Sequence, residues 1–316
     1  MADELFSFDR KPNANYLIAG WRRQWSNGGR ISSGLPRYLI EKLGAKKIGE
    51  LGPEVSKMCY PFQVAGTHDA FRPLASFNEG LPSESMHREN DFFDAGNGLI
   101  IFLGEEPWYR MDLYSQGFFQ AIKELGIQKT VAVEGVNGPA PPELERRITC
   151  AYSKSSMKED LEKYGVQFSS YGSDGRRGPT IGMALVSVAH YEHPDVEMLR
   201  LGAMAPLYPL LASNNQQLGI TRDHRSFYDI LRRLNAMFDL SIDLNELKDL
   251  ADSESLELQT NLDKLSETSR EAKQVIEQVR TEYSFTPFER RVELDPTLDQ
   301  TLEDILRNMP GNPDVN

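Results

Sequence analysis

Short apolar runs alternate with helical patterns over the first two thirds of the chain. The runs at residues 16–21, 46–52, 98–104, 129–136, 166–172 and 196–206 lack clear polar alternation, so they predict strands that are buried on both faces. Between them, segments 34–44, 110–126, 153–165 and 178–193 favour helices, and the first three end in glycine. This alternation is typical of βαβ units, and it predicts an α/β fold: a three-layer core with a mostly parallel sheet.

The pattern changes near residue 224, and from there to about residue 279 the chain is helical and highly charged. Leucines spaced by three, four or seven residues predict an amphipathic pair of helices. These helices either pack on the parent domain or form an arm for dimerisation or for binding a partner. We expect an α/β core domain over residues 1–240, a C-terminal helical extension or arm over 241–295, and a short amphipathic segment with a disordered tail over 296–316.

The net charge of −12 is concentrated in this C-terminal part. Residues 242–316 hold 18 acidic and 8 basic residues, a net of −10, which leaves −2 for residues 1–241. An acidic chain without a basic stripe argues against nucleic acid as a partner, because neutralising phosphates needs clustered Lys and Arg. No apolar run is long enough to predict a membrane span, so we expect no membrane partner.

The two cysteines are too few for a disulfide framework or a cysteine-based metal cluster. The polar, acidic first residues do not predict a secretory signal. We therefore expect a cytoplasmic protein without a metal or a cofactor. No GxSxG elbow, phosphate-binding P-loop or zinc protease motif occurs, so the sequence predicts no catalytic residue.

Two glycine-rich loops are candidates for binding an anion. The first, "GWRRQWSNGG", follows the first strand and offers Arg22, Arg23 and Asn27 together with glycine N–H groups. The second, "GPTIG", opens a helix, with Gly178 in the turn and Thr180 as its cap. A surface loop and ordinary helix-start chemistry explain the same residues, so both interpretations stay open.

The segment "LGEEPWYR" ends the strand at residues 98–104 and precedes a helix. Glu105 and Glu106 suit the positive end of that helix, and Glu106 can pair with Arg110 one turn later. Tyr109 can cover the end of the strand. A catalytic role for the two acids would need an activating partner, and the sequence indicates none. Glu105, Glu106, Tyr109 and Arg110 are therefore candidates for binding a ligand rather than for catalysis.

Four segments in this order resemble the proteasome assembly chaperone family in its archaeal and bacterial branch. They are "AGW" after the first strand, "GLPRYLIEKLGAKKIGELGPE", "LIIFLGEEPWYR" and "GPTIGMALVSVAHYEHPDVEMLRLGAMAP". The resemblance covers residues 14–240. It implies a fold like that of the nucleoside phosphorylases without their active-site residues, and a homo-oligomer such as a trimer that binds a protein client.

Two hypotheses about function follow. The first is a non-enzymatic, oligomeric binding or assembly-chaperone-like protein, which predicts an exposed apolar patch. The second is a phosphorylase- or hydrolase-like enzyme for a nucleoside or another small anionic substrate. The second requires the loops after Gly20, Leu103 and Tyr171 to converge on one crevice.

Overall fold

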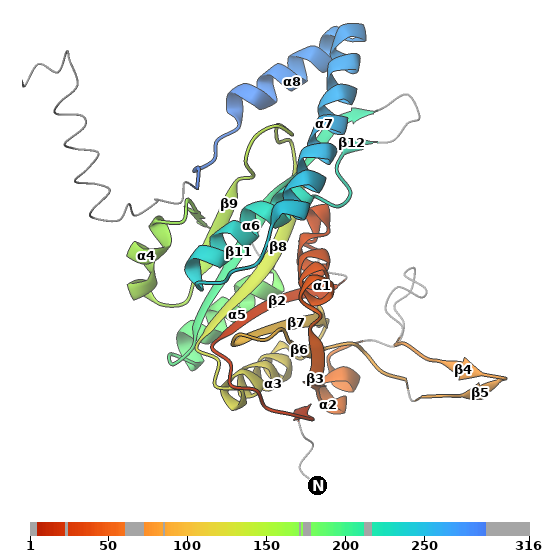
Figure 1. The fold of residues 1–316 in the computed structure, drawn as a ribbon, viewed down its shortest axis with the longest axis vertical. Coiled ribbons are helices and arrows are strands. Elements are labelled where there is room, and N and C mark those ends of the chain that lie inside the picture. Colours follow the sequence, from red (N-terminus) through yellow and green to blue (C-terminus); the bar gives the residue numbers. More distant parts are fainter. Residues whose placement is uncertain are drawn as a thin grey trace, which may run out of the picture.

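The computed structural model describes residues 5–22, 25–60, 73–84, 86–170, 172, 178–211 and 217–288. Its strands are β1 (Phe6–Phe8), β2 (Tyr16–Arg22), β3 (Lys46–Leu51), β4 (Phe77–Asn78), β5 (Leu81–Pro82), β6 (Asp91–Asp94), β7 (Leu99–Glu105), β8 (Lys129–Gly138), β9 (Ile148–Tyr152), β10 (Gln167–Phe168), β11 (Glu197–Leu211) and β12 (Gln217–Gly219). Ten of these form one sheet in the order β1-β3-β6-β7-β2-β8-β11-β9-β10, with β12 paired to β11, and β4 and β5 form a separate hairpin (Figure 1).

The four central strands β7, β2, β8 and β11 are parallel, as the βαβ pattern predicts. The sheet becomes antiparallel at β6, β3 and β1 on one side and at β9 on the other. The predicted α/β class is thus confirmed, and the sheet is mixed, with a parallel centre. The sequence analysis missed β6 and β9, which have four and five residues, because so short a segment shows no reliable period.

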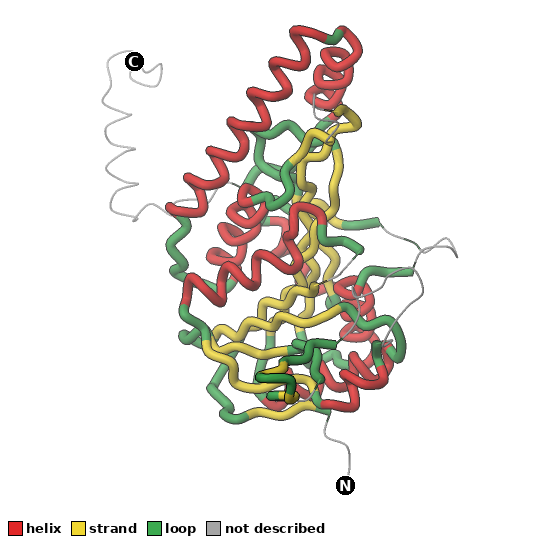
Figure 2. The backbone as a smooth tube through the Cα atoms, turned by 90° about the vertical axis from the view of Figure 1, so that its right-hand side faces the viewer, coloured by secondary structure: helices red, strands yellow, loops and turns green. Residues whose placement is uncertain are grey.

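Helices lie on both sides of the strands (Figures 1 and 2). They are α1 (Ile31–Leu43), α2 (Pro53–Met58), α3 (Met111–Glu124), α4 (Lys158–Glu162), α5 (Ile181–Glu192), α6 (His224–Met237), α7 (Asn245–Thr268) and α8 (Arg270–Glu282), with short 3₁₀ turns η1 (Gly28–Arg30) and η3 (Ser155–Met157). One apolar cluster joins the sheet to α2, α3 and α5, and a second joins it to α1, α4 and α6. These two clusters place a hydrophobic core on each face of the sheet.

Three helical segments stop where the sequence places glycine. Gly44, Gly126 and Gly165 all have positive φ angles of 59°, 72° and 60°, a conformation that glycine adopts without the strain caused by a Cβ atom. The segment predicted as a helix at 153–165 is shorter in the structure, because a 3₁₀ turn occupies its start and α4 has only five residues. The strand predicted at 166–172 is reduced to β10 within the described residues.

The helices α7 and α8 pack against each other and rise above the sheet (Figure 2). A third apolar cluster holds this pair to the long end of β11, with Tyr208 of β11, Leu218 of β12, Leu262 of α7 and Ile276 of α8 among its members. Leu247, near the start of α7, lies in the core cluster beneath α6. The boundary at residues 240 and 241 and the nucleoside phosphorylase-like fold stay predictions, and residues 296–316 lie outside the described part.

A buried ion pair fastens α6 to the loop that precedes β9. Arg146 donates from Nε to Asp223 over 2.9 Å and from Nη2 over 3.2 Å, and both side chains are fully buried. Its Nη1 donates to the carbonyl oxygens of Pro141, Pro142 and Leu144. The arginine thereby satisfies the carbonyl groups of a loop that has no strand partner of its own.

We expect Arg146→Leu to lower the free energy of unfolding by about 3–5 kcal/mol, because it leaves the carboxylate of Asp223 buried without its cation. Arg280→Leu is the matched control, since Arg280 pairs with Glu143 at the surface, where both side chains are more than 40% exposed. The control is expected to cost less than about 1 kcal/mol. Urea unfolding followed by circular dichroism measures both, and equal losses would contradict the role given to the buried pair.

Candidate functional site

The carboxyl ends of β7, β2 and β8 lie next to one another. In the register of β2 and β7, Trp21 is opposite Gly104 and Arg22 is opposite Glu105. The chain after β2 then crosses to β8, where Asn27 forms a bridge with Gly135. Two of the three loops that the enzyme hypothesis requires, those after Gly20 and Leu103, therefore meet at this edge. Tyr171 and Arg23 lie outside the described residues.

Arg22 and Glu106 face the start of the loop between β2 and η1. Arg22 forms an ion pair with Glu89, so its guanidinium group is bound to a neighbouring carboxylate. The backbone N–H of Glu106 donates to the carbonyl oxygen of Arg22 over 3.3 Å. One carboxylate oxygen of Glu106 accepts from the N–H of Trp25 over 3.2 Å, and the Trp25 side chain is 89% exposed. Glu106 therefore holds the loop to the end of β7.

The first turn of α5 is filled by a carboxylate of the chain itself. Glu134 of β8 is fully buried and accepts from Thr180 Oγ1 over 2.7 Å and from the N–H of Gly182 over 2.9 Å. Arg200 of β11 donates to the same carboxylate over 2.6 Å. The sequence left open whether an anion binds at this helix start, and in the structure the internal carboxylate of Glu134 lies there. Gly178 lies exposed just before Thr180.

The side chain of Arg200 also lies over Gly202, which is two residues further along β11 and on the same face of the sheet. A Cβ atom at Gly202 would lie 2.1 Å from Arg200 Nη1 and 2.3 Å from its Cζ atom. Arg200 Nη1 further donates to Thr149 Oγ1 of β9 over 2.8 Å. The bare backbone of Gly202 thus allows Arg200 to fold back and reach both β9 and Glu134.

The loop containing Asn27 uses its polar groups internally. Asn27 accepts from the N–H of Ser33 over 3.1 Å and donates to Ser33 Oγ over 2.9 Å. The N–H of Gly29 donates to the side chain of Asn137 over 3.1 Å. These contacts dock the loop on β8 and use N–H groups that a phosphate would need.

Glu105 lies on a different side of the strand end from Glu106. It is buried and accepts from Arg88 over 2.7 Å, with both side chains only 4% exposed. The guanidinium of Arg88 lies 4.5 Å from the centre of the Tyr60 ring, and the Tyr60 hydroxyl donates to the carbonyl oxygen of Glu105 over 2.6 Å. This cluster fixes the chain segment that leads to β6.

Tyr109 and Arg110 make their described contacts away from this edge. The N–H of Tyr109 donates to the carbonyl oxygen of Cys59 over 3.0 Å, and its side chain is 56% exposed. Arg110 adopts a left-handed conformation and pairs with Asp112, not with Glu106 as the helical spacing predicts. The predicted pair is wrong because Arg110 precedes the first helical residue, so the two side chains do not share a helix face.

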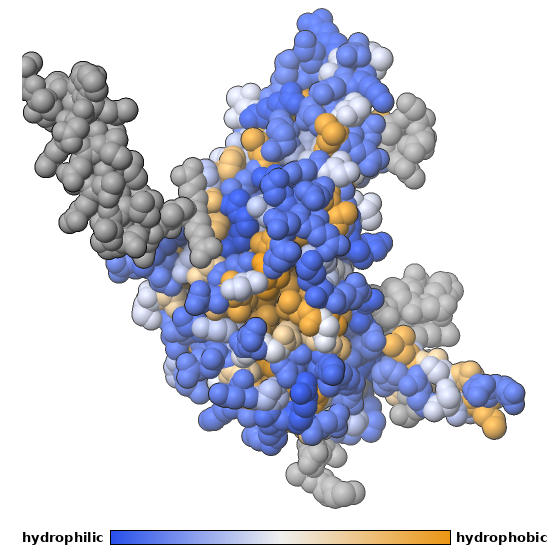
Figure 3. Space-filling view, in the orientation of Figure 1, coloured by the Kyte–Doolittle hydropathy of each residue, from blue (hydrophilic) through white to orange (hydrophobic). Residues whose placement is uncertain are grey.

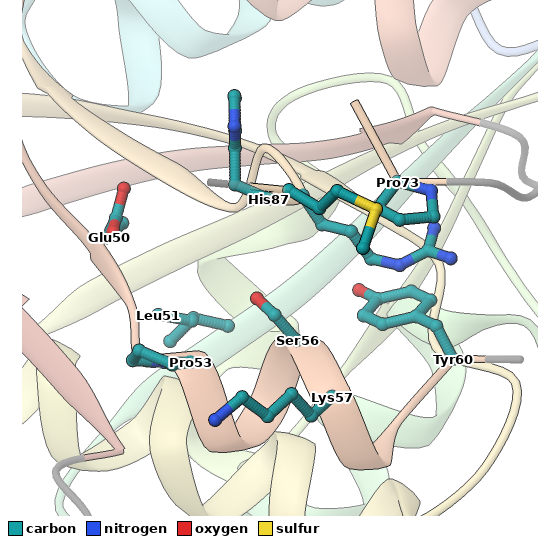
Figure 4. A pocket seen from close by; sticks show the side chains of 10 residues that line it. Glu50, Leu51, Pro53, Ser56, Lys57, Tyr60, Pro73 and His87 are labelled. Atoms are coloured by element: carbon teal, nitrogen blue, oxygen red, sulfur yellow. The ribbon is translucent and has the colours of Figure 1, made fainter. Parts of the chain in front are cut away.

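A cleft of about 620 Å³ lies beside the Arg88 cluster (Figure 4). Pro73 and His87 lie on one side of it, and Ser56 and Lys57 of α2 lie on the other (Figure 4). Tyr60 and Leu51 contribute its buried apolar wall. Sequence reasoning did not find this cleft, since one wall comes from β3 and α2, which follow each other in the chain, and the other comes from Pro73 and residues 86–88, which meet that wall only in the folded protein.

Sequence reasoning also missed the buried charges Glu134, Arg200 and Arg88. The first two carried a usable signal, because each is a single charged residue inside an otherwise apolar strand. A charge at such a position must be paired, so two neighbouring strands with opposite charges predict an ion pair. Among the described residues, no group of three His, Cys, Asp or Glu side chains could hold a metal ion.

The pKa of Glu106 is raised to about 7, mainly because the side chain is buried; the hydrogen bond from the N–H of Trp25 opposes this rise and the charge of Glu134 adds to it. The folded state therefore holds this proton more tightly than the unfolded state does. Its contribution to stability is present below the unfolded pKa of about 4.5 and is lost as the pH rises towards 7.

We expect Glu106→Gln to stabilise the protein at pH 8 relative to the wild type by about 1 kcal/mol, a value reduced for the partial exposure of the side chain. At pH 4.5 the two proteins should have similar stability. Thermal unfolding at both pH values measures the difference, with Glu257→Gln on the exposed side of α7 as control. A Glu106→Gln effect that is the same at both pH values would contradict the raised pKa.

Several solved structures share this fold. A proteasome-assembly chaperone homologue from Mycobacterium tuberculosis is 16% identical, with a TM-score of 0.59 over 78% of this chain and 94% of that one. The archaeal proteasome activator PbaB from Pyrococcus furiosus is also 16% identical, with a TM-score of 0.54 over 82% of this chain and 99% of that one. A protein of unknown function from Corynebacterium glutamicum is 12% identical, with a TM-score of 0.62 over 95% of this chain and 99% of that one.

No curated protein matches the chain by sequence. The family model described as the PAC2 family matches residues 24–262, which is most of the chain. This match confirms the resemblance to the proteasome assembly chaperones; it begins after the segment "AGW" and extends beyond residue 240, into α7. The chain belongs to the PAC2 family.

Proposed function

We propose that the protein is a non-enzymatic, homo-oligomeric assembly factor that binds a protein client. The observation that carries this proposal is the PAC2 family match over residues 24–262, together with structural neighbours described as a proteasome-assembly chaperone homologue and a proteasome activator. The client and the number of subunits, for which a trimer is one closed form, are part of the proposal. A cytoplasmic location is part of it too; no helix in the described residues is long and apolar enough to cross a membrane.

The pairing of charges at the strand ends supports binding over catalysis. Glu134 is held by Arg200, Thr180 and an N–H group, and Arg22 is held by Glu89. A phosphorylase or hydrolase would instead need cations and N–H groups that face a substrate. Glu106, with its pKa of about 7, is the one predicted site residue with a property that acid–base chemistry could use.

The exposed acidic face of α7 is the surface that we assign to the client. This helix exposes six acidic residues and two basic ones. The acidic residues are Glu246, Asp249, Asp252, Glu257, Asp263 and Glu267, and the basic residues are Lys248 and Lys264. The excess of negative charge fits a client with a basic surface. Electrostatic recognition of this kind weakens as the salt concentration rises.

We expect tagged protein, purified at low salt from its own cells, to retain a client in a fixed ratio. A variant carrying Asp249→Lys, Glu257→Lys and Glu267→Lys should lose at least about 90% of that client, because like charges would then face each other. Glu159→Lys with Glu192→Lys is the control, since both acids are exposed on other helices. Quantitative mass spectrometry measures the recovery. Equal recovery from both variants would contradict the assignment to α7.

A separate measurement tests the enzyme alternative. Inorganic phosphate and nucleosides at millimolar concentration should leave the unfolding temperature unchanged, because the α5 start and the Asn27 loop use their N–H groups internally. A rise in that temperature with ligand concentration would favour the enzyme, because a ligand that binds only the folded state stabilises it.

A further inference from the structure

The hairpin of β4 and β5 projects from the body of the molecule (Figures 1 and 3). We call residues 73–84 the arm from here on; this hairpin is distinct from the C-terminal helical segment expected over residues 241–295. Every residue from 74 to 84 is exposed, so the arm makes little contact with its own chain. A lone two-stranded hairpin is marginally stable in water. Its turn also contains Glu79 in a left-handed conformation with φ of 48°, which is strained for a residue other than glycine.

The arm is apolar on both of its faces. In its register Phe77 is opposite Pro82, and Asn78 is opposite Leu81, so Phe77 and Leu81 point to opposite faces. Phe77 is 68% exposed and Leu81 is 73% exposed. Figure 3 shows apolar atoms at the tip and at the base of the arm. A hairpin with one apolar face could lie on a surface, whereas one with two apolar faces is covered only when it enters a cleft.

The cleft at the base of the arm has suitable dimensions and chemistry. Its volume of about 620 Å³ lies within the range of about 300–1,000 Å³ that ligand pockets occupy. Met86, which is 62% exposed, lines it together with the apolar residues Leu51, Pro53 and Tyr60. Because Phe77 and Leu81 are exposed, the tip of the arm does not fill the cleft of its own chain.

Exposed apolar side chains concentrate around these two features. Twelve large apolar residues are exposed in the described part of the chain, and half of them lie on the arm, on α2 beside the cleft, or on adjoining segments. These six are Met58, Leu74, Phe77, Leu81, Met86 and Tyr109. Such a concentration is typical of a protein interface.

The charges of the two features are complementary. The arm carries Glu79 and Glu84, whereas Lys57 stands at the cleft with a side chain that is 70% exposed and also pairs with Glu54 of its own helix. Glu50, the acid that also lines the cleft, pairs with Lys47. Since the arm and the cleft belong to the same chain, every copy offers both halves of one contact.

We propose that the arm of one copy inserts its tip into the cleft of a neighbouring copy. Reciprocal insertion closes a dimer, and insertion in one direction around a ring closes a trimer or a larger assembly. This inference rests on the homo-oligomeric part of the proposed function and names the surface that forms the oligomer.

Light scattering after size exclusion, on the full chain at micromolar concentration, tests the contact. We expect the wild type to be oligomeric, and Phe77→Glu with Leu81→Glu to raise the dissociation constant at least about 100-fold, since two apolar anchors become charged. The positions are exposed, so the circular dichroism spectrum should not change. Leu256→Glu is the matched control, because Leu256 is 68% exposed but lies on α7.

A disulfide test locates the contact. We prepare Leu81→Cys and Ser56→Cys as separate proteins and mix them under mild oxidation. Position 81 and position 56 are then changed on different chains, so a disulfide between them joins two copies of the protein. We expect a covalent dimer from this mixture and none from Leu256→Cys with Ser56→Cys. The native Cys59 and Cys150 are buried and occur in both mixtures.

The outcomes separate the two proposals. A monomeric wild type overturns both this inference and the homo-oligomeric part of the proposed function. A wild-type oligomer that survives the arm substitutions, or a Leu81→Cys mixture that links no better than the control, overturns the arm-to-cleft contact alone.

Discussion

A charge that is removed from water must be paired within the protein, and this constraint organises the structure. Arg146 with Asp223 and Arg233 with Glu145 tie α6 to the loop before β9, and Arg233 also reaches the carbonyl oxygens of Tyr164 and Gly165. Glu134 with Arg200 joins the centre of the sheet to α5, and Arg88 with Glu105 closes one wall of the cleft. Each pair connects elements that the hydrophobic core alone would hold in less defined positions.

The same constraint decides what the strand ends can do. The carboxyl edge of a parallel sheet is where α/β proteins usually bind ligands, because several loops and helix starts converge there. In this chain the internal carboxylate of Glu134 fills the helix start, Arg200 and Arg88 pair with Glu134 and Glu105, and the N–H of Trp25 binds Glu106. Among the described residues, these internal pairs stabilise the edge, and our proposals assign recognition to the arm, its cleft and the acidic helix α7.

The alternation of apolar runs with helical patterns predicted the parallel centre of the sheet, and glycine at the end of three segments predicted where helices end. These signals lie within single segments or between neighbouring ones. They could not predict β6 and β9, which are too short, or the cleft, whose walls meet only in the folded chain. In the candidate site, the strand ends do hold Arg22, Glu105, Glu106 and Thr180. Sequence alone did not reveal their partners: Glu89 pairs with Arg22, Arg88 pairs with Glu105, and Glu134 accepts a hydrogen bond from Thr180. The Arg110 pairing failed because Glu106 and Arg110 both precede the first residue of α3, so their side chains do not share a helix face.

The close approach of Arg200 to Gly202 limits how this strand edge could evolve. A side chain at position 202 would push the guanidinium group of Arg200 away from its present position, and loss of that group would leave Glu134 buried without its cation. We therefore expect the residues at positions 134 and 200 to change together, with position 202 limiting how the arginine can fold back. Opening this strand edge to a ligand would require breaking a buried ion pair, whereas the exposed hairpin and helix α7 can change in sequence without leaving a buried charge unpaired.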